Sequence, residues 1–270
     1  MSDNQTSPNT RDWLLLIGGS TYKFTLTGFY LVALVAILKN HGYSLNQLSW
    51  IHLIGSIEAA KVLFAALMER RPAGQFGRFR GWLLAATLGL SAVFGLMACT
   101  DITQNFPLLL TCCVLLSAMS AVYGCAMLGL SCIVLPHRER GFGGVIQTMA
   151  ARGGKMIGGA LVLWLYQEYG QTAAAGFMLA FSLLMLLQLL YYRELESPTA
   201  QGSWTALAAR LVSFWQQPET GWRWLVLLFA VAAPYAFMAA TFVPKLADLG
   251  FNPKQTGGIL AVGIPVACLI

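Results

Sequence analysis

The sequence carries little charge for its length. Only 10% of its 270 residues are Asp, Glu, Lys or Arg, whereas 57% are apolar and the mean hydropathy is +0.64. Soluble domains carry about a quarter charged residues, so this composition excludes that class. The apolar residues gather in runs of roughly 20, the length of a helix that crosses a bilayer. The sequence therefore predicts an all-α, multi-pass membrane protein.

Other signals are also absent. Met1 to Thr10 contain no Lys or Arg, so no cleavable signal peptide is predicted. The six cysteines lie in or beside apolar runs, without the spacing of zinc ligands or of a disulfide framework. The net charge of +6 falls mostly in short loops, which excludes nucleic-acid partners. Motifs such as His-Glu-x-x-His and Gly-x-Ser-x-Gly are missing, so we expect no catalysis, no bound metal and no cofactor.

The apolar runs and the basic residues together predict a topology. Of the Lys and Arg residues outside the spans, ten fall on one side of the membrane and three on the other. Because Lys and Arg resist translocation, the richer side is expected to be cytoplasmic, together with the N-terminus. The predicted spans lie near residues 12–38, 45–68, 82–100, 108–135, 142–166, 172–192, 221–243 and 257–270.

An arginine-rich loop separates the second and third spans. It reads Leu67-Met68-Glu69-Arg70-Arg71-Pro72 and continues as Gly77-Arg78-Phe79-Arg80-Gly81-Trp82. The pattern resembles the loop between spans two and three of the major facilitator superfamily, in particular the branch of bacterial muropeptide permeases and single-subunit siderophore permeases, although Glu69 stands where Asp is more usual. The resemblance implies a secondary transporter of the major facilitator fold, with a gating loop that includes Glu69, Arg70, Gly77, Arg78 and Arg80.

An internal repeat indicates how the chain is divided. Residues 38–55 and 246–263 align without a gap at an offset of 208, and a Leu, two Gly, a Gln and an Ile coincide. The second copy indicates that a second half of the fold begins there. We expect a six-span bundle over residues 1–193, a cytoplasmic linker with an amphipathic helix over 194–220, and the first spans of a C-terminal bundle over 221–270. A complete repeat would run past Ile270, so we expect a truncated sequence.

A second resemblance covers the fifth span. Leu135-Pro136, Glu139-Arg140-Gly141 and the stretch from Ile146 to Trp164 are similar to the muropeptide permeases, and Lys61 falls where this branch carries a lysine. The fourth span differs, because residues 120–133 contain none of the acidic residues that muropeptide permeases have there. This difference favours the siderophore permeases.

Ionisable residues inside spans are costly unless they face a cavity or a partner, so they are candidates for function. Cations outnumber the single acid, Glu58, which predicts a pocket for an anionic ligand. The alternative is that these residues form ion pairs that stabilise the bundle, as the spacing of Glu58 and Lys61 allows. We expect Arg152 and Lys61 to point into the bundle. The predicted substrate-binding residues are Lys23, Tyr30, Lys61, Arg152 and Lys155, and the predicted proton-coupling residues are Glu58 and His52.

The function predicted from the sequence is proton-coupled import of an anionic siderophore or similar metal chelate across the cell inner membrane. Muropeptide import and efflux of an amphipathic anion are the alternatives, since all these solutes carry acidic groups. The expected partners are a small anionic substrate, protons and the lipid bilayer, and the protein is expected to act as a monomer.

Overall fold

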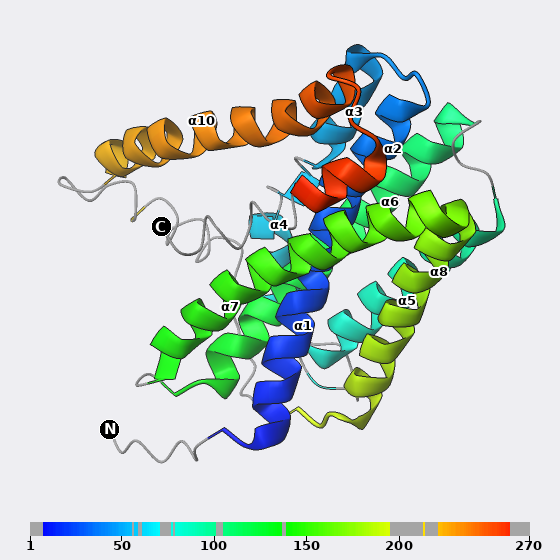
Figure 1. Cartoon of the computed structure of the whole chain (residues 1–270). Coiled ribbons are helices and arrows are strands. Elements are labelled where there is room, and N and C mark those ends of the chain that lie inside the picture. Colours follow the sequence, from blue (N-terminus) through cyan, green and yellow to red (C-terminus); the bar gives the residue numbers. More distant parts are fainter. Residues whose placement is uncertain are drawn as a thin grey trace.

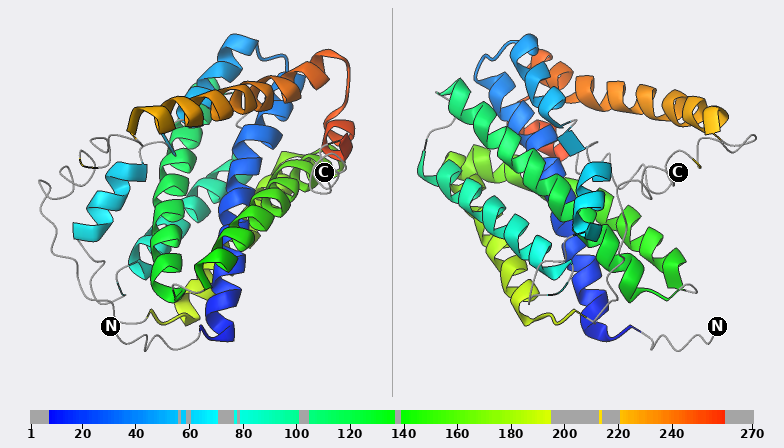
Figure 2. Two further views of the ribbon diagram at one scale, coloured as in Figure 1. Left: turned by 90° about the vertical axis from the view of Figure 1, so that its left-hand side faces the viewer. Right: turned by 180° about the vertical axis from the view of Figure 1, so that it is seen from behind.

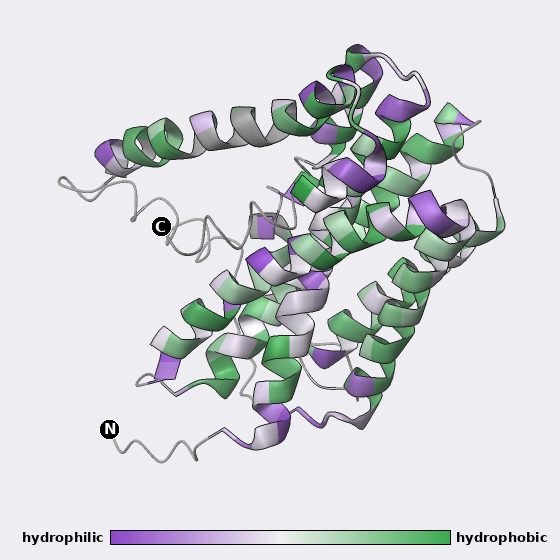
Figure 3. Cartoon of the chain, viewed as in Figure 1, coloured by the Kyte–Doolittle hydropathy of each residue, from purple (hydrophilic) through white to green (hydrophobic). Residues whose placement is uncertain are grey.

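The computed structural model describes residues 8–55, 57–58, 61–70, 77, 79–100, 105–136, 139–194, 213 and 221–259, with only some of the side chains in α4 and α10. Every element of this part of the chain is a helix (Figure 1). Four of its helices are long and apolar enough to cross a membrane: Thr10–Asn40, Arg80–Cys99, Phe106–Val134 and Arg140–Tyr191. Figure 3 shows apolar residues along these helices and hydrophilic ones mainly near their ends. The predicted all-α membrane architecture is confirmed.

The first span is a continuous helix at the centre of the bundle. It consists of α1 (Thr10–Gly28), a π-helical turn, η1 (Phe29–Ala33), and α2 (Leu34–Asn40). Asn9 caps its beginning, and the Asp12 carboxylate accepts a hydrogen bond from the Asn9 amide, a capping box that satisfies the first amide groups of the helix. Most residues from Leu15 to Leu38 are buried, so this span lies among the other helices.

The second span is broken, whereas the sequence predicted one helix over residues 45–68. It consists of α3 (Leu45–Gly55) and α4 (Lys61–Arg70), with residues 57–58 in a 3₁₀ turn between them. A break in a span frees backbone carbonyls that lipid cannot satisfy, so neighbouring helices must supply donors. The hydroxyl of Ser117 on α6 does so, donating to the Ile54 carbonyl at 3.0 Å. Hydropathy alone does not reveal such a substitute bond.

The next helices follow the predicted spans. They are α5 (Arg80–Cys99), α6 (Phe106–Val134), α7 (Arg140–Lys155), the π-helical η5 (Met156–Leu161) and α8 (Val162–Tyr191). α8 is interrupted at Gly170, whose φ of 81° is a left-handed conformation that favours glycine. The chain therefore turns between residues 142–166 and 172–192, as the span boundaries predicted.

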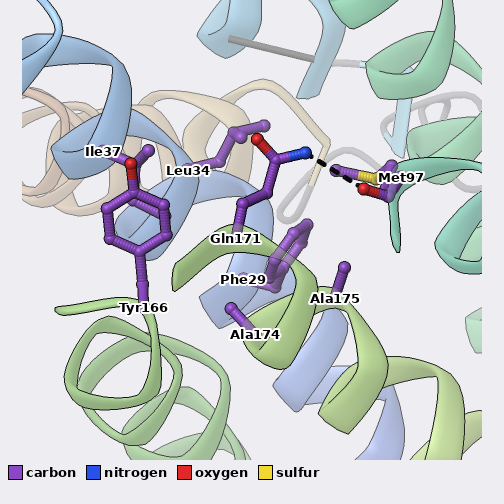
Figure 4. Close-up of a pocket in the computed structure, with 8 residues that line it drawn as sticks. All are labelled: Phe29, Leu34, Ile37, Met97, Tyr166, Gln171, Ala174 and Ala175. Carbon is purple, nitrogen blue, oxygen red and sulfur yellow. Dashed lines mark hydrogen bonds between the residues drawn. The ribbon is translucent and has the colours of Figure 1, made fainter. Parts of the chain in front are cut away.

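α5 and α8 are joined at the end of the bundle opposite Arg80. The Gln171 side-chain amide, just after the Gly170 turn, donates to the carbonyls of Met97 and Thr100 at 3.0 and 2.7 Å and so caps the end of α5. Figure 4 shows Gln171 reaching toward Met97 beside a small, largely apolar cavity of about 20 Å³. Midway along the two helices the Ser91 and Ser182 hydroxyls lie 2.8 Å apart. These bonds hold the third and sixth spans together.

Glycines bring α7 close to α1. A Cβ atom at Gly154 would lie 2.7 Å from the Thr21 carbonyl oxygen, and one at Gly158 would overlap the carbonyl oxygen of Thr25. Only glycine permits this approach, so the small residues at Gly154 on α7 and Gly158 on η5 form a packing contact with α1.

The internal repeat appears in the structure as two equivalent turns. The first joins α2 to α3, and the second follows α10 (Gly221–Asp248). Gly42 and Gly250 both have φ of 84°. The Tyr43 amide donates a hydrogen bond to the Leu38 carbonyl, and the Phe251 amide donates one to the Leu246 carbonyl, both at 3.2 Å. At the next position, glutamine side chains accept 3.0 Å bonds from the backbone amides of Ser44 and Asn252. The aligned residues therefore fold alike.

α10 lies across the end of the bundle at which α2 turns into α3, as both views in Figure 2 show. We call this end the Gly42 end and the opposite one, where α5 begins, the Arg80 end. At the Gly42 end Lys39 forms a 2.7 Å ion pair with Asp248, and Lys254 pairs with Glu168. The predicted amphipathic helix in the linker and most of the last predicted span lie outside the described residues.

Candidate substrate site and gating contacts

A partly buried group of polar side chains surrounds Glu58 at the break in the second span. Lys23 donates to both carboxylate oxygens, at 2.8 Å to Oε2 and 3.1 Å to Oε1, and Lys61 donates to Oε2 at 2.9 Å. The Tyr30 and Ser120 hydroxyls donate to Oε1 at 2.7 and 3.0 Å. We call these five residues the Glu58 group. Such a set of donors stabilises the ionised form of a carboxylate.

Each member of the group is placed by a local feature of its helix. Tyr30 lies in the π-helical turn η1, and π-helical turns often occur at functional sites. Lys23 lies on α1, and its aliphatic stem runs along Gly124 of α6, where a Cβ atom would lie 2.7 Å from Lys23 Cε. Lys61 is the first residue of α4, directly after the break. α1, α4 and α6 thus converge on Glu58.

The group carries a net positive charge. Two lysines face one carboxylate, and the other donors are neutral hydroxyls. The exposure of the charged side chains differs: 10% for Lys23, 17% for Glu58 and 39% for Lys61. Lys61 is therefore the more exposed of the two cations, whereas Lys23 is enclosed. The ion pair with Glu58 that the sequence spacing suggested is present, and the structure adds the second lysine.

The other predicted site residues are not among the five members of this group. Arg152 and Lys155 are on α7, where Arg152 is exposed and Lys155 half-buried. Neither donates to Glu58 among the hydrogen bonds described above, and the expectation that Arg152 points into the bundle stays a prediction. His52 lies on α3, with Nδ1 3.2 Å from the Leu48 carbonyl oxygen. In the described part of the chain, no three His, Cys, Asp or Glu residues are placed to hold a metal ion.

Of the predicted gating loop, the structure describes Gly77, Arg80 and the backbone of Glu69 and Arg70. The Arg80 guanidinium donates to the carbonyls of Leu189 and Leu190 at 2.9 and 2.8 Å, which caps the end of α8. This places the loop beside the end of α8, and Figure 1 shows α7 beginning at the same end of the bundle. Arg78 lies outside the described residues, as do the side chains of Glu69 and Arg70.

Glu194, which follows α8, also contacts the beginning of α5. Its carboxylate accepts hydrogen bonds from the backbone amide of Phe79, at 2.9 and 3.1 Å, and from the backbone amide of Arg80, at 2.8 Å. Because the first amides of a helix have no partner within it, Glu194 acts as the cap of α5. Gly77, with φ of 88°, lies against this carboxylate, and a Cβ atom there would clash with it. α5 and α8 therefore cap each other at the Arg80 end.

This mutual capping gives a stability prediction. Glu194→Ala is expected to lower the free energy of unfolding by about 1–3 kcal/mol, because three backbone bonds to a charged acceptor are lost. Thermal unfolding of the purified protein in detergent measures the change. The matched control is Glu168→Ala, which removes an exposed ion pair and should cost at most about 1 kcal/mol. Equal effects of the two substitutions would contradict the capping role of Glu194.

The sequence did not identify Ser117, Ser120, Gln171 or Glu194. The three neutral residues lie in or beside apolar spans, where single polar residues usually bond to their own helix. Glu194 lies at the start of the predicted linker, outside the loop pattern. A signal was available for the serines, since Ser117 and Ser120 are three residues apart and so share a face of α6.

Comparisons with known proteins agree with this architecture. Residues 15–270 match the Major Facilitator Superfamily. The chain is 27% identical over 251 residues to proteins named anhydromuropeptide permease in Escherichia coli K12 and in Escherichia coli O157:H7. The match covers 90% of this chain and 50% of each relative, so the chain spans about half the length of the curated relatives it matches. With nearly all of its length matched to one family of transporters, the chain belongs to the major facilitator superfamily.

Proposed function

We propose that this chain forms the substrate-binding half of a proton-coupled permease that imports a carboxylate-bearing solute across the cell inner membrane. The observation that carries the proposal is the net positive charge of the Glu58 group in the interior of the bundle. A membrane interior holds uncompensated charge only at high cost, so a counter-ion must be supplied from elsewhere. An anionic substrate supplies it.

The two relatives are named anhydromuropeptide permeases, which favours anhydromuropeptides as the class of solute. Anhydromuropeptides carry carboxylates, which suit the exposed ammonium of Lys61, and we propose this class as the substrate. Siderophores are the second candidate, favoured by the fourth span: α6 offers the hydroxyl of Ser120 to Glu58 and carries no acidic residue over residues 120–133. Both classes are imported, so the proposed direction of transport is inward, with the Arg80 end and the N-terminus in the cytoplasm and the protein acting as a monomer.

Lys61 provides the proposed coupling step. In the described state Lys61 is bound to Glu58, and its side chain is the most exposed of the three charged groups. A substrate carboxylate that binds Lys61 draws it from Glu58 and leaves that carboxylate with fewer donors. Glu58 then takes up a proton, and release of the substrate returns Lys61 to Glu58 and expels the proton. Binding of the substrate to Lys61 is thereby coupled to protonation of Glu58. His52 remains a candidate for a second proton carrier.

Uptake into proteoliposomes tests this proposal. The full-length protein should accumulate radiolabelled anhydromuropeptide when the outside is acidic, and a protonophore should abolish accumulation. Uptake of a ferric carboxylate siderophore instead would select the second candidate, and uptake of neither would refute the proposal. Arg152→Ala should weaken substrate affinity by about three- to tenfold, less than a buried contact would, because an exposed cation is screened by solvent.

A further inference from the structure

A groove lies between α3 and α10 at the Gly42 end, apart from the Glu58 group. Its volume is about 520 Å³, within the usual range of small-molecule pockets, about 300–1,000 Å³. One wall is α3 and the other is the second half of α10. The polar lining includes Ser49, His52, Lys245 and Asp248, and the apolar lining includes Leu48 and Phe237.

The charged residues of the groove lining are Lys245 and Asp248, one of each sign. Asp248 is paired with Lys39 at 2.7 Å, so those two charges cancel. Lys245 is exposed and, among the described residues, has no carboxylate within ion-pairing distance. The His52 ring is held by its Nδ1 contact with Leu48, so its other nitrogen is available to a ligand. The lining therefore suits a solute with one acidic group and an apolar body.

The wall formed by α3 leads to the Glu58 group. α3 ends at Gly55, beside the Tyr30 ring, whose Cε2 would lie 3.5 Å from a Cβ atom at that glycine. The Tyr30 hydroxyl in turn donates to Glu58. His52, in the groove, precedes Glu58 by six residues on the same broken span. α3 therefore extends from the groove to the vicinity of the Glu58 group.

We infer that this groove is an access site, where the acidic group of the arriving solute binds Lys245 before it reaches Lys61. The inference rests on the proposed function, because it assigns a second site to the same anionic solute. The solute's apolar body lies against Leu48 and Phe237, and its charge is held by Lys245 beside the neutralised Asp248. Two weak cationic sites in sequence concentrate an anion without trapping it.

Thiol labelling tests the charge of the groove without requiring transport. Ser49→Cys in the full-length protein introduces a reactive thiol into the lining, and labelling of the parent's natural cysteines is subtracted. The probes are 2-sulfonatoethyl methanethiosulfonate, an anion, and its trimethylammonium counterpart, each normalised to its rate with a free thiol. The anionic probe should react faster by about three- to tenfold. In Ser49→Cys/Lys245→Gln the two rates should become equal, whereas Ser49→Cys/Lys254→Gln should retain the preference.

The solute itself provides the second measurement. Anhydromuropeptide should protect the Ser49→Cys thiol from labelling, and protection should persist when Lys61→Gln is added, because the access site lies before Lys61. Equal rates for the two probes, or a faster cationic probe, would overturn the inference. A preference for the anionic probe without protection would overturn the access role. Failure of the proposed function appears separately, as a lack of uptake by the parent protein.

Discussion

Replacing Glu58 with leucine is expected to stop transport and to lower the free energy of unfolding by about 3–5 kcal/mol. Lys23 is only 8% exposed, and its ammonium bonds to both Glu58 oxygens. Without the carboxylate, a buried cation remains with no counter-charge, which is among the most costly changes in a protein interior. Thermal unfolding in detergent and uptake into proteoliposomes measure the two effects.

A second substitution separates the two roles of Glu58. In Lys23→Met/Glu58→Leu both buried charges are removed, so most of the lost stability should return, since apolar residues can replace a buried ion pair at little cost. Transport should remain absent, because the proposed proton carrier is missing. If Glu58→Leu were as stable as the parent, Lys23 and Glu58 would not form a buried pair in the folded protein.

Lys61→Gln is expected to weaken substrate binding by about ten- to a hundredfold, or about 1–3 kcal/mol, with little loss of stability. The affinity falls because the accessible cation of the group is removed. Stability changes little because Lys23, Tyr30 and Ser120 still donate to Glu58, and the Lys61 side chain is already 39% exposed. Equilibrium binding of labelled anhydromuropeptide to the full-length protein measures the affinity.

The matched control for Lys61 is Lys254→Gln. Lys254 is also paired with a glutamate, Glu168, but at the exposed Gly42 end, outside both the Glu58 group and the groove. Its replacement should leave affinity within about twofold, because exposed ion pairs contribute little. A substrate that bound equally well to Lys61→Gln and to the parent would place its acidic group elsewhere, and Arg152 would be the next residue to examine.

The sequence predicted the helices better than the contacts between them. Runs of apolar residues marked the spans. The repeat around Gly42 and Gly250 marked two equivalent segments, which the structure shows as turns with the same backbone conformation and hydrogen bonds. Both signals are local, so neighbouring residues are enough to reveal them. The pairing of Glu58 with Lys61 was predictable for the same reason.

The contacts that build the site are long-range, and this explains what the sequence could not show. Lys23 and Glu58 are 35 residues apart, and they meet only because the second span breaks and Gly124 leaves room for the lysine stem. At the break, the Ile54 carbonyl accepts a hydrogen bond from Ser117, which lies 63 residues further along the chain. No pattern within one helix reports such a contact.

The caps of α5 also bear on how the chain is assembled during synthesis. Phe79 and Glu194 are 115 residues apart, and a ribosome needs roughly 6–23 s to add that many residues at about 5–20 per second. Throughout this interval the first amides of α5 must be satisfied by water or lipid headgroups at the bilayer surface, which keeps that end of the helix from sinking into the hydrocarbon. The Glu194 cap of α5 can form only after translation has passed residue 194, so these amides acquire their acceptor within the protein late in synthesis.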